Sequence, residues 1–153
     1  MLGYASLRGG LLIAPTDRSA QLESLLSDPP PEAHLLPARI ELTPHDARVL
    51  ARRVWALDAL ADDYRARIQT MRNAIDAATG DPPVGPQALR AFMAAMQPVY
   101  DTIARDPLLP RELLPDEWPA TALGEAFRTT LETLGPAASA YVDTLRELLA
   151  DSS

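Results

Sequence analysis

One spacing pattern constrains this chain more than any other feature. Between residues 50 and 78, apolar side chains recur at alternating steps of four and three residues. That period places them on one face of an α-helix and predicts a buried stripe. Thr43-Pro44 is the expected start, because threonine is a favoured N-cap and proline fits the first helical position. The stripe consists of Leu50, Val54, Leu57, Ala61, Tyr64, Ile68, Met71, Ile75 and Ala78.

The same stretch contains signals for its end and for an interruption. Gly80 is expected to end the helical run. Asp58 can cap a second helix, so the sequence also permits a break near Trp55–Asp58.

Later segments show the helical period again. Residues 86–105 predict a helix that Pro98 should kink, and Thr121 can cap the helix after it. Gly135-Pro136 is expected to separate that helix from a final one. The side chains expected to face inward are Leu89, Phe92, Met93, Met96, Val99, Tyr100 and Ile103, then Leu123, Phe127, Leu131 and Leu134, and finally Tyr141, Val142, Leu145, Leu148 and Leu149.

Residues 1–43 have a different pattern. Two short apolar runs joined at Arg8-Gly9-Gly10 predict a β-hairpin, and a short leucine-bearing helix should follow it. Alternating apolar residues from Leu36 to Leu42 predict a third strand, at a sheet edge where Pro37 is tolerated. We therefore expect a mainly α fold, with about four to five helices in residues 44–153 and a strand-strand-helix-strand segment before them.

Charge and composition limit the function. The 14 basic residues are all arginine, and 21 acidic residues give a net charge of −7. Binding to nucleic acid or to an anionic membrane needs clustered positive charge, so neither role fits this chain alone. The chain has no cysteine and therefore no disulfide or thiolate metal site. Its apolar runs are too short for an export segment or a bilayer span, and we expect a cytoplasmic protein.

No arrangement of side chains predicts catalysis. His34 and His45 do not belong to a spaced metal-ligand set, and adjacent Asp62 and Asp63 diverge by about 100° on a helix. The Gly-x-Ser-x-Gly and Gly-x-Gly-x-x-Gly motifs are missing. We therefore expect no enzyme activity, no metal and no cofactor.

An excess of arginine on the predicted long helix is a stronger candidate for function. Arg48 and Arg52 share a face at i,i+4, and Arg53 is adjacent. Guanidinium groups bind phosphate and carboxylate in a bidentate manner, so these residues are a candidate anion clamp; solvated arginines paired with acids are the alternative. The large aromatic residues either wall an apolar pocket or pack in the core. They are Trp55, Tyr64, Tyr100 and Trp118.

Residues 106–119 contain the most specific motif in the chain. Prolines alternate there with apolar residues, which predicts a loop held against the core. The segment resembles the signature of the C-terminal domain of PaaX-type repressors, which control phenylacetic acid catabolism in bacteria. Trp55 through Tyr64 resembles that family's Trp-x-Leu…Tyr helix, and Leu2-Gly3-Tyr4 through Pro15 resembles its Gly-aromatic hairpin. The motif residues are Asp106, Pro107, Leu108, Leu109, Pro110, Leu113, Leu114, Pro115, Trp118 and Pro119.

The resemblance implies a three-part repressor: a winged helix-turn-helix, a middle ferredoxin-like (Cas2-like) domain and a helical C-terminal domain. It also implies a dimer that releases DNA on binding phenylacetyl-coenzyme A. Residues 1–43 then correspond to the last four elements of the middle β-α-β-β-α-β domain, and residues 44–153 to the C-terminal domain. The winged helix is expected to be absent, so DNA contact would need a domain that this chain lacks.

Two functional hypotheses result. In the first, the chain is the effector-response and dimerisation part of such a repressor and binds phenylacetyl-coenzyme A or a related acyl-coenzyme A. Its expected effector-binding residues are Arg52, Arg53, Trp55, Tyr64 and Trp118. In the second, the chain is a ligand-free helical module that pairs with itself or with a full-length relative.

Overall fold

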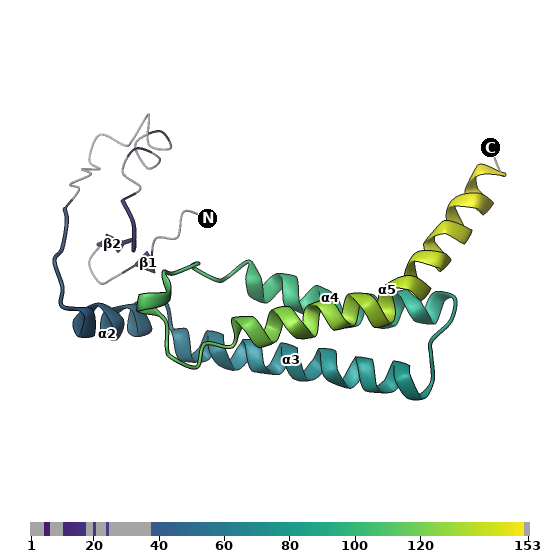
Figure 1. Cartoon of the computed structure of the whole chain (residues 1–153). Helices are drawn as coiled ribbons and strands as arrows, with labels where there is room; N and C mark the ends of the chain where they lie inside the picture. Colours follow the sequence, from purple (N-terminus) through teal and green to yellow (C-terminus); the bar gives the residue numbers. More distant parts are fainter. Residues whose placement is uncertain (1–4, 7–10, 18–19, 21–23, 25–37, 152–153) are drawn as a thin grey trace. The chain divides into compact units, whose positions relative to one another are not determined.

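The computed structural model describes residues 5–6, 11–17, 20, 24 and 38–151 (Figure 1). The chain forms two compact units. Unit 1 comprises residues 1–57 and 107–116, and unit 2 comprises residues 58–106 and 117–153. Each unit therefore combines segments that lie far apart in the sequence.

Unit 1 contains a hairpin of two short strands. β1 (Ala5–Ser6) pairs antiparallel with β2 (Leu12–Ile13), so that Ala5 lies opposite Ile13. The pairing confirms the predicted hairpin, whereas its turn and the expected leucine-bearing helix lie outside the described residues. The expected third strand is not formed in its described part, because residues 38–42 are exposed and lack regular secondary structure. A strand needs a neighbouring strand for its hydrogen bonds, and the described sheet contains only β1 and β2.

The first described helix, α2 (Pro44–Val54), starts where the sequence predicts. Thr43 is the N-cap: its Oγ1 accepts a hydrogen bond from the backbone N–H of Asp46 at 3.2 Å. The helix ends before Ala56, whose φ of 47° lies in the left-handed region. That conformation costs a non-glycine residue roughly 1–2 kcal/mol and interrupts the helix. The predicted break between α2 and α3 (Leu57–Gly80) is therefore confirmed.

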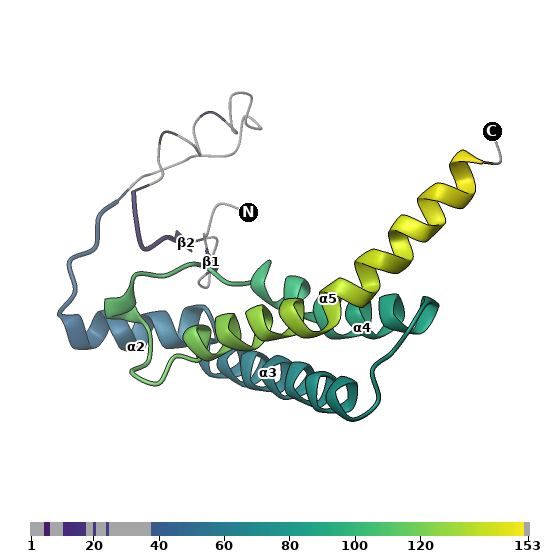
Figure 2. The same ribbon diagram turned by 45° about the vertical axis from the view of Figure 1, so that its right-hand side comes forward.

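Unit 2 consists of α3 after its first residue, α4 (Pro86–Ile103) and α5 (Ala120–Ala150). In both views, α4 runs back along α3 and α5 lies alongside them (Figures 1 and 2). Gly80 ends α3, as predicted. The described residues are thus mainly helical, which confirms the expected fold class at this level.

The predicted stripe of α3 forms much of the core of unit 2. Tyr64, Ile68 and Met71 are buried in one cluster with Val99 of α4 and Leu123 of α5. A second buried cluster joins α3, α4 and α5 through Ala78, Ala95 and Leu134. Every residue of the predicted stripe is buried or half-buried.

The predicted inward face of α4 is partly wrong. Met93, Tyr100 and Ile103 are exposed by 47%, 55% and 42%. α4 instead buries a face that includes several smaller side chains. Small side chains let helices approach closely, so the size of an apolar residue does not identify the buried face. The buried residues of α4 are Ala88, Ala95, Met96, Val99 and Thr102.

Two predictions about α5 are wrong. The helix starts at Ala120 with Pro119 as its N-cap, so Thr121 is not the cap. It also continues through Gly135 and Pro136 to Ala150. A proline inside a helix removes one hydrogen bond and bends the axis, and the last part of α5 does turn away from the first (Figures 1 and 2). Beyond the bend, Leu145, Leu148 and Leu149 are exposed rather than inward.

We predict that Leu134 and Leu131 of α5 differ strongly in their contribution to stability. Leu134 is 1% exposed, whereas Leu131, also expected inward, is 39% exposed. Leu134→Ala should lower the free energy of unfolding by about 2–5 kcal/mol, because it leaves a cavity in the core. Leu131→Ala should cost about 1 kcal/mol or less, since its side chain retains much of its contact with water. Urea denaturation of both variants tests this, and equal losses would contradict the packing.

Candidate functional site

Two of the predicted site residues lie together in unit 2. The rings of Tyr64 in α3 and Trp118 just before α5 are 5.5 Å apart between centroids, with an angle of 48° between their planes. Tyr64 is 3% exposed, and Trp118 is half-buried against the same core cluster. Their position makes them part of the packed interior of unit 2.

Tyr64 also holds the other end of the family-like motif. Its hydroxyl donates a hydrogen bond to Oδ2 of Asp106 at 2.5 Å. The residues one step earlier form a second link, an ion pair of 2.8 Å between Arg105 and Asp63. Both side chains of that pair are more than one-third exposed, so it is worth about 1 kcal/mol at most. The Tyr64 hydrogen bond is the stronger of the two links, because its acceptor is charged.

The surroundings of Tyr64 alter its acidity. Burial removes the phenol from water, and the hydrogen bond and negative charge of Asp106 act in the same direction. Together they raise the pKa of the Tyr64 hydroxyl well above its ordinary value of about 10. Tyr64 therefore stays protonated and able to donate over the whole physiological range. We call the contacts of Tyr64 with Asp106 and Trp118 the Tyr64 clamp.

The segment between the two ends of the clamp has its own structure in unit 1. It contains a short 3-10 helix, η2 (Arg111–Leu113), which packs against α2. Nε of Arg48 donates to the carbonyl oxygen of Glu112 at 2.7 Å. The guanidinium of Arg111 donates to the carbonyl oxygens of Pro115 and Asp116 at 2.8 and 2.9 Å. The prediction of an ordered loop with contacts to neighbouring structure is therefore confirmed.

Within this loop, two neighbouring leucines have opposite environments. Leu109 is 7% exposed and buried, whereas Leu108 is 78% exposed. Leu108 has a φ of 53°, a strained conformation for a leucine. The buried side chain holds the loop, and the exposed one contributes little to packing.

The three remaining predicted site residues belong to unit 1. Arg52 and Arg53 lie exposed in the last turn of α2. Trp55 is the C-cap of α2 and is half-buried, and its indole Nε1 is a buried donor that lacks a hydrogen-bond partner. Arginines at a helix C-terminus interact favourably with the helix dipole, which gives Arg52 and Arg53 a structural role as well.

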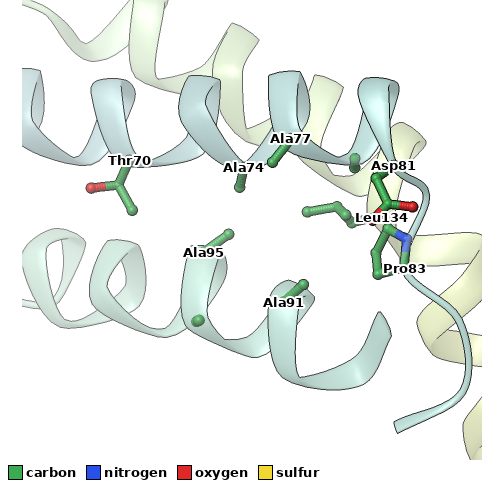
Figure 3. Close-up of a pocket in the computed structure, with 10 residues that line it drawn as sticks. Thr70, Ala74, Ala77, Asp81, Pro83, Ala91, Ala95 and Leu134 are labelled. Carbon is green, nitrogen blue, oxygen red and sulfur yellow. The ribbon is translucent and has the colours of Figure 1, made fainter. Parts of the chain in front are cut away.

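Unit 2 contains an apolar cleft that the search for motifs did not identify. It has a volume of about 300 Å³ and is lined mainly by alanines of α3 and α4 that point toward one another (Figure 3). Leu134 of α5 contributes to its lining, and Asp81 and Pro83 lie at one end. A repeated spacing could have revealed the cleft, because alanines recur at i, i+3 and i+4 in both helices. They are Ala74, Ala77 and Ala78 in α3, and Ala91, Ala94 and Ala95 in α4.

The described residues contain no obvious site for bond-making chemistry. No group of three or more histidine, aspartate or glutamate side chains is positioned to hold a metal within the described part of the chain. His45 is exposed in the first turn of α2, and Asp62 forms an ion pair with Arg65 at 2.7 Å. His34 lies outside the described residues. None of the described helices is both long and apolar enough to cross a membrane.

Comparison with known proteins gives one match. The model of the PaaX-like protein C-terminal domain matches residues 55–144, which is more than half of the chain. The matched region includes the Tyr64 clamp, the motif at 106–119 and the apolar cleft. A comparison with curated proteins returns no match.

We predict that removal of the Tyr64 hydroxyl destabilises the fold. Tyr64→Phe keeps the ring against Trp118 but deletes the hydrogen bond to Asp106. The free energy of unfolding should fall by about 1–3 kcal/mol, because the bond has a charged acceptor. Tyr100→Phe is the matched control: the Tyr100 residue is 55% exposed, and its loss of a hydroxyl should change stability by about 0.5 kcal/mol or less. Chemical denaturation at neutral pH measures both.

Alkaline pH distinguishes the hydrogen bond from simple packing. Because the native pKa of Tyr64 is raised, its contribution is complete below about pH 10 and decreases above it, when the unfolded tyrosine loses its proton first. Above about pH 10, the stability of the native chain should therefore approach that of Tyr64→Phe, by up to about 1.4 kcal/mol per pH unit. A stability difference that stays constant with pH would contradict a raised native pKa.

Proposed function

Because this chain belongs to the PaaX-like family, we propose that it is the effector-response and dimerisation part of a bacterial transcriptional repressor and has no enzyme activity. The match over residues 55–144 is the observation that carries the proposal. In this proposal, residues 1–43 are part of a ferredoxin-like middle domain, and residues 44–153 form the C-terminal domain. DNA recognition depends on a winged-helix domain outside this chain, and the protein acts in the cytoplasm.

The effector in this proposal is an aryl- or acyl-coenzyme A, with phenylacetyl-coenzyme A as the first candidate. Arg52 and Arg53 are exposed and supply guanidinium groups suited to the phosphates of coenzyme A. The indole N–H of Trp55 is an unused donor close to them in the sequence. Tyr64 and Trp118 support the site from the core, since Tyr64 is almost fully buried and its hydroxyl is already bonded.

Control of DNA binding follows if the ligand prefers one arrangement of the repressor. A ligand shifts a conformational equilibrium only by the difference between its affinities for the two states. The same difference couples ligand binding to DNA release, and the coupling is reciprocal. The acidic charge of this chain agrees with a sensing role, because DNA contact would need clustered basic residues.

We predict that the purified chain binds phenylacetyl-coenzyme A and that Arg52 and Arg53 contribute to the affinity. The double variant Arg52→Ala/Arg53→Ala should bind at least about ten-fold more weakly, because two charge-assisted contacts to phosphate are lost. Isothermal titration calorimetry at low and high salt measures this, and the native affinity should fall as salt rises.

The matched control is Arg128→Ala/Arg146→Ala, which removes the same charge from α5. Both arginines are exposed and paired with acids, Arg128 with Glu132 and Arg146 with Asp143. This variant should bind like the native chain. Absence of heat and of a melting-temperature shift with the native chain at millimolar ligand would reject the effector role.

A second candidate function is a ligand-free module that pairs with a copy of itself or a full-length relative. Exposed apolar side chains in unit 2 favour it, including Met93 and Tyr100 of α4 and Leu131 of α5. The ring of Tyr100 packs edge-on against Phe127 of α5 at 5.9 Å, which links the apolar surfaces of the two helices. Exposed apolar patches frequently mark protein–protein interfaces.

We predict that this α4–α5 surface mediates self-association. The double variant Met93→Ser/Tyr100→Ser should shift the chain toward monomer by about ten-fold or more in the dissociation constant, because it removes apolar contact area. Sedimentation velocity over a range of concentrations measures the shift. Val84→Ser is the control, since Val84 is 74% exposed in the loop between α3 and α4. A native chain that is monomeric at all concentrations would reject this candidate.

A further inference from the structure

The apolar cleft of unit 2 exists because of a change in side-chain size along two neighbouring helices. Met71 of α3 and Val99 of α4 are both fully buried in the larger core cluster. Such large side chains keep the helices apart at that level. Further along α3 the facing residues are alanines, which leave the space unfilled (Figure 3). Residues of α3, α4, α5 and the loop after α3 together line a hollow of about 300 Å³.

The size of the hollow limits what it can hold. A cavity of about 150 Å³ is sufficient for benzene, and pockets for drug-sized ligands begin at about 300 Å³. A volume of about 300 Å³ therefore accepts a ring or a short branched chain. It is too small for the nucleotide and phosphates of coenzyme A, which must remain outside it.

The chemistry of the lining selects further. The walls are methyl groups of alanines together with Leu134, which favour an apolar occupant. Polar groups enter at the ends of the cleft, where Thr70 and Asp81 lie (Figure 3). The carboxylate of Asp81 repels an anion at that position and can accept a hydrogen bond from an amide. A thioester carries no charge, and the pantetheine arm that follows it contains amide N–H groups.

We infer that this cleft holds the acyl group of the acyl-coenzyme A effector, an inference that rests on the proposed function. The cleft admits a compact apolar acyl group such as phenylacetyl. Asp81 discriminates against the corresponding free acid, whose carboxylate would lie beside it. The protein thereby senses the activated thioester rather than the aromatic acid from which the thioester is made.

The test fills the cleft without changing its polarity. Ala74→Leu places a larger side chain in the hollow from α3, and Ala91→Leu does so from α4. Ala66→Leu is the matched control, because Ala66 is exposed on α3 and does not line the cleft. Calorimetry with phenylacetyl-coenzyme A, free coenzyme A and phenylacetate compares these variants with the native chain, and circular dichroism establishes that each is folded.

We expect Ala74→Leu and Ala91→Leu to weaken phenylacetyl-coenzyme A at least ten-fold and to leave the weaker binding of free coenzyme A unchanged. Ala66→Leu should bind like the native chain, and Asp81→Asn should improve the binding of phenylacetate. Native affinity for phenylacetyl-coenzyme A in both filled variants would overturn the cleft as the acyl site but leave the effector role intact. No binding of either coenzyme A compound to the native chain would overturn both.

Discussion

The fold of unit 2 depends on the contacts that one buried tyrosine makes with two distant points of the chain. Tyr64 bonds to Asp106 at the end of α4 and packs against Trp118 at the start of α5. Between these points the chain leaves unit 2 and forms the loop that contains η2. Bringing loop ends together costs conformational entropy, and a buried hydrogen bond with an aromatic contact offsets part of that cost. The relative position of α4 and α5 therefore depends on Tyr64.

Periodicity predicted the parts of the fold in which one large apolar stripe faces the core. Tyr64, Ile68 and Met71 were predicted inward and are buried, and the N-cap at Thr43 follows from local chemistry. The inward face of α4 could not be predicted in the same way, because its buried side includes Ala88 and Ala95 whereas the larger Tyr100 is exposed. Burial is decided by which helices meet, and the sequence of one helix does not contain that information.

The path of α5 was mispredicted for a related reason. Gly135-Pro136 is a typical helix-ending pair, yet Leu134 and Ala138 on either side of it are buried in the core. Their packing offsets the hydrogen bond that Pro136 removes, so the helix bends instead of ending. The candidate site shows the same limit. Sequence alone identified Tyr64 and Trp118 as important, but their contact with each other and the cleft between alanines depend on tertiary packing.

The Tyr64 clamp and the cleft lie on the same helix. Tyr64 and Ala74 are separated by ten residues of α3, or about 15 Å at 1.5 Å per residue. Both lie at the packing of α3 against α4, Tyr64 through the core cluster with Val99 and Ala74 through the alanine walls. Packed helices move as rigid elements, so an occupant that pushes α3 and α4 apart at the cleft also loads the contacts at the clamp. An acyl group in the cleft can then favour one arrangement of the motif loop without touching it, because the loop leaves and re-enters unit 2 at the two residues that Tyr64 holds.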